Sequence, residues 1–207
     1  VRIDGSQGEG GGQVLRTALG LSIVTGQPFQ IDAIRAHRRK PGLMRQHLTA
    51  VRAAQEVSGA RVRGDALHSQ SLCFEPGELR PGSYEFKIGT AGSTNLVLQT
   101  LIPAMLVSPE AWQVRIEGGT HNPMAPPAPF LIHCFVPMLE RMGARLSVHL
   151  ERAGFHPAGG GVLHCESCRG GQLEAIDILE RGKLLQKEAG AAVAQLPRTI
   201  AQREIGT

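Results

Sequence analysis

Apolar and polar positions follow one pattern twice along the chain. In each copy a glycine-containing stretch leads into an apolar helix, a short apolar run predicts a strand, and a second helix ends at a Gly-Ala-Arg triplet that enters another strand. The expected elements of the first copy are a helix from Val14 to Thr25, a strand from Pro28 to Ile34 and a helix from Leu43 to Val57. Those of the second copy are a helix after Ser93 that runs through Leu106, a strand from Trp112 to Ile116 and a helix from Phe130 to Met142.

Corresponding points of the two copies lie about eighty residues apart, which is too far for a short solenoid repeat. The pattern therefore predicts a duplicated β-α-β-α-β-β unit and an α/β fold. We place the first unit at residues 1–84 and the second at residues 85–178.

A glycine run stands directly before the first helix. It reads Gly5-Ser6-Gln7-Gly8-Glu9-Gly10-Gly11-Gly12-Gln13, so several backbone N–H groups can approach one phosphate, and the helix start adds partial positive charge there. Glu9 would lie beside phosphate oxygens, where a carboxylate is useful mainly as a metal ligand. A strained turn between a strand and a helix explains the glycines equally well. Neither the dinucleotide fingerprint nor the Gly-Lys-Ser/Thr loop fits, because Gln13 replaces the third glycine and Lys183 is followed by Leu184.

A basic string follows the first expected strand. It contains Arg35, Arg38, Arg39 and Lys40, then the chain break Pro41-Gly42, and then Arg45-Gln46-His47 in the first turn of the next helix. Cations in a first turn oppose the helix dipole unless an anion lies among them. The string therefore favours an anion-binding site. The alternative is a solvated basic loop, which is the usual fate of a charge run.

Composition limits the partners. The chain has 207 residues, 42% of them hydrophobic, which is enough to bury a core, and its net charge of +4 makes nucleic acid or nucleotide a plausible partner. Aromatic residues make up only 4%, which argues against a surface that stacks on single strands along its length. We therefore expect any RNA to be held at an end or by a few phosphates. Apolar stretches are short, so we expect no membrane partner and a cytoplasmic location.

Cysteines and two further loops add less. Four cysteines are too few for a disulfide scaffold, and Cys165 and Cys168 beside His164 lack a second pair for a structural zinc site, so they are interpreted as ordinary strand residues. The proline-rich loop from His121 to Pro127 can hold a flat ring against an apolar wall, or it can simply end a strand and start a helix. The glycines from Gly154 to Gly161 are explained by a tight turn.

Together these motifs resemble the RNA 3'-terminal phosphate cyclase family. The resemblance rests on four strings in order along nearly the whole chain: Gly8-Glu9-Gly10-Gly11-Gly12-Gln13, the string from Arg35 to His47 that contains Lys40-Pro41-Gly42-Leu43, Gly118-Gly119-Thr120-x-Asn122-Pro123, and Pro157-Ala158-Gly159-Gly160-Gly161. Ala153 departs from the family, which usually has a basic residue there. The family fold implies three such units with a small domain inserted between the second and third, and residues 179–207 would be the truncated beginning of that insertion.

The resemblance implies an ATP-dependent, RNA-processing ligase that converts an RNA 3'-phosphate to a 2',3'-cyclic phosphate through adenylylated intermediates. ATP and a divalent metal, Mg²⁺ or Mn²⁺, are the implied cofactors, and RNA 3'-phosphate ends are the implied substrate. The alternative is a cyclase-like protein without catalysis that binds RNA or assists ribosome assembly. Because such relatives usually lose the glycine–glutamate run and the basic string, both of which are intact here, the enzyme lineage is favoured.

Site residues are carried over position by position. Glu9 matches the metal-proximal carboxylate. The residues that match the phosphate-handling, catalytic site are Arg16, Arg35, Arg38, Gln46 and His47. Gln99 matches a nucleotide contact, and Pro126 and Phe130 match apolar packing around the adenine. Arg16 and Gln99 are singled out only by the resemblance.

One family feature has no counterpart. The family's histidine nucleophile lies in its C-terminal third, and none of the eight histidines of this chain occupies that motif. We therefore expect the chain alone to be inactive and to form no covalent nucleotide adduct. Without a third unit we also expect an exposed apolar flank that favours self-association.

Overall fold

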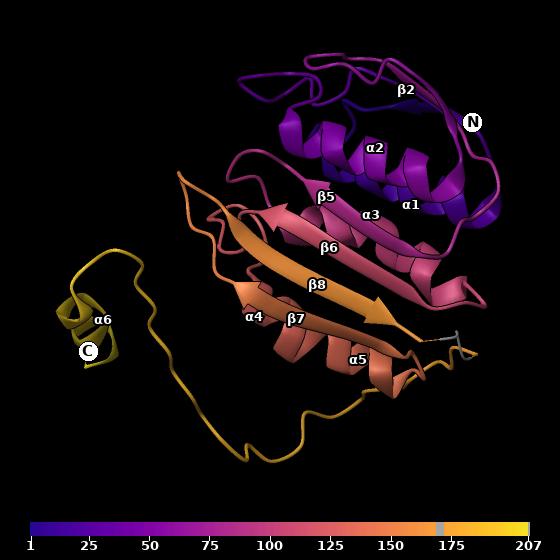
Figure 1. The fold of residues 1–207 in the computed structure, drawn as a ribbon. Coiled ribbons are helices and arrows are strands. Elements are labelled where there is room, and N and C mark those ends of the chain that lie inside the picture. Colours follow the sequence, from indigo (N-terminus) through magenta and orange to yellow (C-terminus); the bar gives the residue numbers. More distant parts are fainter. Residues whose placement is uncertain (169–171, 207) are drawn as a thin grey trace. The chain divides into compact units, whose positions relative to one another are not determined.

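The computed structural model describes residues 1–168 and 172–206 (Figure 1). Contacts within the chain define two compact units, Val1–Glu174 and Ala175–Thr207. The first unit holds both copies of the sequence pattern. The predicted boundaries within the chain, including a further small domain from residue 179, stay predictions.

The first copy forms a four-stranded sheet with two helices. Its elements are β1 (Arg2–Asp4), α1 (Gln13–Thr25), β2 (Phe29–Asp32), α2 (Arg45–Ser58), β3 (Arg61–Arg63) and β4 (Leu72–Glu75). The strand order is β1-β2-β4-β3, in which β1 and β2 are parallel and the other two pairs are antiparallel.

The second copy repeats this topology. Its elements are β5 (Ser83–Lys87), α3 (Thr94–Val107), β6 (Trp112–Gly118), α4 (Ala128–Phe130), the π-helix η1 (Leu131–Phe135), α5 (Val136–Arg141), β7 (Leu146–Arg152) and β8 (Gly161–Ser167). The strand order is β5-β6-β8-β7, again with one parallel pair followed by two antiparallel pairs. The predicted α/β fold with a duplicated β-α-β-α-β-β unit is confirmed.

The helix predicted from Phe130 to Met142 is interrupted. It begins at Ala128, widens into η1 and resumes as α5, in which Pro137 is an early residue. Proline has no N–H to donate to the carbonyl four residues earlier, so the regular ladder cannot continue through it. The π-helix is rare and occurs mostly as a single turn within an α-helix, as η1 does here.

The helices of the two copies pack on each other and share one core. α3 contacts both α1 and α2, and a single cluster of buried side chains runs from Leu15 in α1 to Trp112 in β6. α1 and α3 approach closely at Gly20, where an added Cβ would lie 3.3 Å from both Pro103 Cγ and the carbonyl oxygen of Thr100. This close packing holds the starts of the helices, which line the candidate site described below, in fixed positions.

An apolar groove of about 420 Å³ remains on the same helices, lined by residues of α1, α3, η1 and α5. Leu21, Val24 and Val107 are large hydrophobic side chains exposed in this region. The sequence predicted an exposed apolar flank, and self-association through it stays a prediction.

The second unit contains one helix, α6 (Arg198–Ile205), among its described residues, and no helix or strand is assigned to residues 175–197. Across the part of the chain that the structure describes, no helix has the length and apolar character needed to cross a membrane.

Candidate functional site

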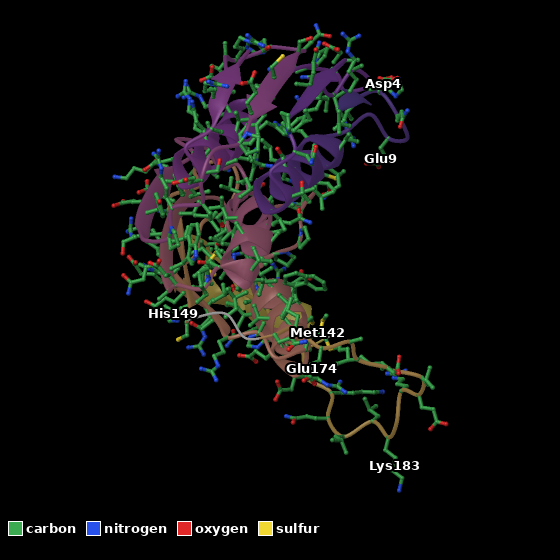
Figure 2. All side chains as sticks on the ribbon, turned by 90° about the vertical axis from the view of Figure 1, so that its right-hand side faces the viewer. Asp4, Glu9, Met142, His149, Glu174 and Lys183 are labelled. Atoms are coloured by element: carbon green, nitrogen blue, oxygen red, sulfur yellow. The ribbon has the colours of Figure 1, made fainter. Side chains whose placement is uncertain are left out.

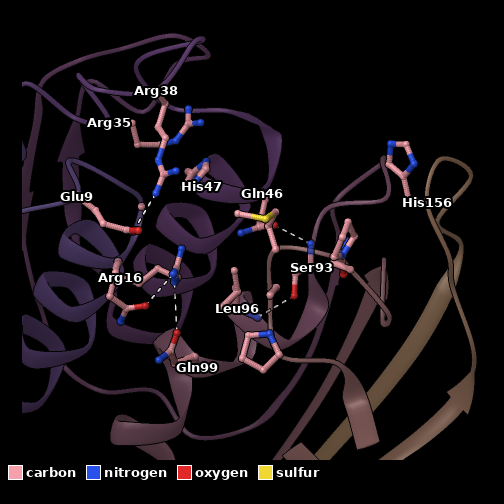
Figure 3. Close-up of a pocket in the computed structure, with 17 residues that line it drawn as sticks. Glu9, Arg16, Arg35, Arg38, Gln46, His47, Ser93, Leu96, Gln99 and His156 are labelled. Carbon is pink, nitrogen blue, oxygen red and sulfur yellow. Dashed lines mark hydrogen bonds and ion pairs between the residues drawn. The ribbon is translucent and has the colours of Figure 1, made fainter. Parts of the chain in front are cut away.

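A cavity of about 710 Å³ lies where the first turns of three helices meet, and we call it the main cavity (Figure 3). Gly12 and Gln13 come from the start of α1, Gln46 and His47 from the start of α2, and Ser93 and Leu96 from the start of α3. The first turn of a helix lies at the positive end of the helix dipole. Three such ends around one space favour a negatively charged ligand.

Arg16 is a buried cation in this cavity. Its side chain is only 7% exposed, and its two hydrogen bonds go to uncharged amides: Nη2 donates to Gln13 Oε1 at 2.8 Å and Nε donates to Gln99 Oε1 at 3.4 Å. Burial lowers the pKa of the Arg16 guanidinium to about 10, so it stays charged near neutral pH. A buried charge without a counter-ion is costly, and a bound anion would remove that cost.

His47 is buried beside Arg16 and is uncharged. Burial, followed by the positive charges of Arg35 and Arg16, lowers the pKa of His47 to about 3. The glycine run lies directly against the imidazole, because a Cβ at Gly12 would stand 2.4 Å from His47 Nε2. Any side chain at this position would displace His47 or Arg16. Glycine at position 12 is therefore explained by close approach to the site.

Two arginines come from the basic string. Nη1 of Arg35 donates to the carbonyl oxygens of Lys40 and Gly42, both at 2.7 Å, so this side chain also holds the shape of its own loop. Arg38 is half-exposed, and its Nη2 donates to Glu9 Oε2 at 2.9 Å. Glu9 is 85% exposed on the glycine-rich loop, at the edge of the molecule in Figure 2. This pair joins the two phosphate-binding motifs that the sequence predicted separately.

The two amides Gln46 and Gln99 that line the cavity both use their side-chain oxygens as hydrogen-bond acceptors. Gln46 Oε1 accepts a hydrogen bond from the backbone N–H of Ser93 at 2.6 Å, which leaves the Nε2 group of Gln46 as its free end. The oxygen of Gln99 is likewise occupied by Arg16. With three arginines and only one carboxylate among the lining residues, the cavity is suited to phosphate oxygens.

The second copy supplies the opposite wall. It consists of the loop Asn122 to Pro126 and His156. The loop is held by Asn95 Nδ2, which donates to the carbonyl oxygen of Pro126 at 2.6 Å, and by Asn122 Nδ2, which donates to that of Ala91 at 2.5 Å. The wall is therefore attached to α3 and to the segment before it.

The structure brings together all of the predicted site residues except one. Those that line the main cavity are Glu9, Arg16, Arg35, Arg38, Gln46, His47, Gln99 and Pro126. Phe130 does not line it and is 47% exposed. The roles assigned to these residues stay predictions.

Ser93, Leu96 and His156 line the cavity but were not singled out by sequence. Ser93 caps α3 through its side chain, which accepts from the N–H of Leu96, so it reads as an ordinary cap. His156 stands in a glycine-rich segment that a tight turn explains. The one signal for Ser93 is the duplication itself, because its position before α3 corresponds to that of Gly12 before α1.

The implied metal can be tested against the donors present. In residues 1–168 and 172–206, no group of three or more His, Cys, Asp or Glu side chains is placed to hold a metal ion. Glu9 alone offers one carboxylate, so a cation beside it would take its other oxygens from phosphates and water. That donor set suits Mg²⁺, which is commonly held by one or two carboxylates together with substrate phosphates.

Fold and cavity thus define a duplicated α/β protein with a cation-lined site between its two copies. A family model described as RNA 3'-terminal phosphate cyclase matches residues 7–200. The chain belongs to this family.

Three relatives bear the name RNA 3'-terminal phosphate cyclase. The chain is 55% identical to the one from Koribacter versatilis over 205 residues, 52% to the one from Ralstonia nicotianae over 206 residues and 49% to the one from Salmonella typhimurium over 207 residues. These matches cover 99%, 99% and 100% of this chain, but 58%, 59% and 61% of the relatives. The chain therefore spans less than two thirds of their length.

Proposed function

We propose that the main cavity binds the 3'-terminal phosphate of RNA for its ATP-dependent conversion to a 2',3'-cyclic phosphate. The observation that carries the proposal is the buried guanidinium of Arg16, which has only amide partners and lies where three helix starts meet. Membership in the family and the names of the relatives support the choice of ligand.

The chemistry requires activation of the phosphate. A phosphate monoester dianion is a poor electrophile, whereas its mixed anhydride with AMP has a good leaving group. In the cyclisation step the 2'-oxygen forms a bond to phosphorus, the bond from phosphorus to the AMP oxygen breaks so that AMP leaves, and the 2'-hydroxyl gives its proton to the solvent. Negative charge on the transferring phosphoryl group is then neutralised by the guanidinium groups of Arg16, Arg35 and Arg38 and by the helix starts.

Residues on the second copy would orient the nucleotide. Gln99 is fixed by Arg16, and Pro126 by Asn95, so both offer a preorganised contact for the AMP part of ATP. Phe130 is proposed for the adenine side, outside the lining of the main cavity. A divalent metal beside Glu9 would supply further charge neutralisation on phosphate oxygens.

The proposal is tested at Arg38, whose planar fork suits bidentate contact with a phosphate dianion better than a lysine does. Arg38→Lys should weaken binding of a 3'-phosphorylated oligoribonucleotide about tenfold, which corresponds to the loss of one charge-assisted contact. Binding of the same oligonucleotide with a 3'-hydroxyl should change little. Titration of both against parent and variant measures this.

Equal losses for the two ends would contradict the proposal. They would show that the basic string is a general electrostatic patch, as expected for a cyclase-like protein that binds RNA without acting on its end. Arg39→Lys is the matched control, because Arg39 belongs to the same string but does not line the cavity.

A further inference from the structure

A second groove lies beside the start of α2 and contributes nothing to the main cavity. We call it the basic groove. Its volume is about 420 Å³, and it is lined by Arg45, Leu48, Thr49, Arg52, Asp65, Ala66, Leu67 and Ile88. It shares no lining residue with the main cavity.

Two unpaired cations face this groove from one side of a helix. Arg45 and Arg52 are seven residues apart on α2, which is nearly two full turns, and both are exposed. Neither forms an ion pair with any residue the structure describes. Arg61 and Arg115, by contrast, are each bound to glutamates. The groove therefore keeps two positive charges available for a ligand.

The basic groove and the main cavity are lined in part by neighbouring residues of the chain. Arg45 in the groove precedes Gln46 in the cavity, and the segment from Ile88 in the groove to Ser93 in the cavity separates the two spaces. Gln46, which lines the main cavity, accepts a hydrogen bond from the N–H of Ser93 and so connects the start of α2 to this segment. A strand that ends in the main cavity can therefore leave it over the start of α2.

We propose that the basic groove binds the sugar-phosphate backbone of a single RNA strand just upstream of its 3' end. This rests on the proposed function, because it assumes that the strand's end lies in the main cavity. Seven helical residues span about 10 Å along the axis, so Arg45 and Arg52 contact different phosphates of one strand. Leu67, which is 42% exposed, offers the groove's apolar surface to a sugar or base.

Asp65 allows a test in which a negative charge of the groove is removed instead of a positive one. Its carboxylate lies in the same groove without an ion pair to a described residue, so it should repel a phosphate backbone. Removing a positive charge should weaken RNA binding, and Asp65→Asn should tighten it about twofold, as expected for an exposed charge interaction. If these charges served only the fold, removing a positive charge and removing the negative charge of Asp65 would not change the affinity for RNA in opposite directions.

The experiment measures binding of a ten-nucleotide RNA, with either a 3'-phosphate or a 3'-hydroxyl, to the full chain and to the variant Arg45→Ala/Arg52→Ala. Each lost contact with a single strand lowers the salt slope by about 0.7, so raising salt from about 50 to about 200 mM should weaken binding by the variant about sevenfold less than by the parent. The change should be the same for both RNA ends. A nucleoside 3'-monophosphate should bind the variant as it binds the parent.

Arg141→Ala is the control, because Arg141 is an exposed arginine of α5 that lines neither space. An unchanged salt slope, or equal effects of Arg141→Ala, would overturn the groove proposal. Failure of the proposed function looks different: the parent would not distinguish the two ends, while the effect of the groove variant on both would remain measurable.

Discussion

Arg16 carries opposite consequences for stability and for binding. In the free protein its buried charge is satisfied only by amide oxygens, and burial of a charge opposes folding. With an anion beside it, the same charge would attract the ligand strongly, because the guanidinium is buried. In the proposed site, affinity for an anion would therefore be gained at the expense of the stability of the free chain.

Arg16→Met tests this balance. The variant replaces the guanidinium with a shorter, unbranched apolar side chain. Because the buried charge is removed, the free protein should be at least as stable as the parent, with a gain of up to about 2 kcal/mol. The stabilisation that a 3'-phosphorylated nucleotide gives to the parent should disappear. Urea unfolding with and without the nucleotide measures both effects. A variant that is less stable but still stabilised by the nucleotide would contradict the anion-site interpretation.

His47 links the site to pH. The unfolded chain protonates this side chain near its ordinary pKa of about 6.5, whereas the folded chain protonates it only near a pKa of about 3. Between these values the unfolded state binds more protons, so the free energy of unfolding falls as pH falls. By about pH 4 the loss from this group should approach 3 kcal/mol.

The measurement compares the parent with His47→Gln, which cannot titrate at this position. The difference in free energy of unfolding between them should shrink from about pH 7 to about pH 4, because only the parent loses the contribution of His47. Inorganic phosphate should reduce the effect by favouring the charged imidazole. Parallel pH profiles for the two proteins would show that His47 is not held neutral.

The sequence predicted the charged and glycine-rich motifs of the candidate site better than the other residues that line the cavity. Glu9, Arg38 and His47 stand in motifs whose charge or glycine content is itself a signal. Arg16 and Gln99 look like ordinary helix residues and were found only through the family resemblance. Ser93 and His156 reach the cavity because the second copy folds against the first, and no local pattern encodes that contact.

At the scale of elements, the crossing of α1 and α3 depends on the absence of a side chain at position 20. Gly20→Val would place two methyl groups against Pro103 and the backbone at Thr100. The Cβ of the new side chain alone would already lie 3.3 Å from both. Overpacking should cost about 1–3 kcal/mol, partly offset by the better helix propensity of valine. Urea unfolding against Leu21→Val, an exposed change in the same helix, measures the cost. Equal stability of the two variants would show that the helices can move apart.

Elements were predictable where one local signal dominates. The starts and ends of α1 and α3 follow from glycine-containing stretches and apolar spacing, and these helices form within one or two residues of the expected bounds. The expected start of α2 at Leu43 was two residues early, because Leu43 is buried in the preceding loop and α2 begins at Arg45. Apolar spacing also hid the π-turn before Pro137, since spacing reports which face is buried and not which carbonyl accepts each N–H.

At the scale of the whole molecule, duplication was the most informative prediction. The matching orders β1-β2-β4-β3 and β5-β6-β8-β7 follow from a repeat that is visible in the sequence as spacing alone. The docking of the two copies was not visible, because it depends on which helix faces pack together. It is this docking that turns two separate motifs into one cavity.

Because the main cavity lies between the two copies, binding of a ligand there should depend on both copies being packed together. Neither copy has a complete wall, since α1 and α2 face α3 and the Asn122 to Pro126 loop across the space. A ligand that contacts both copies should raise the free energy of global unfolding, and not only stabilise one loop. If the chain were divided in the linker at residues 76–82, the halves would behave as a split reporter, in which the phosphate ligand promotes complementation of the two fragments.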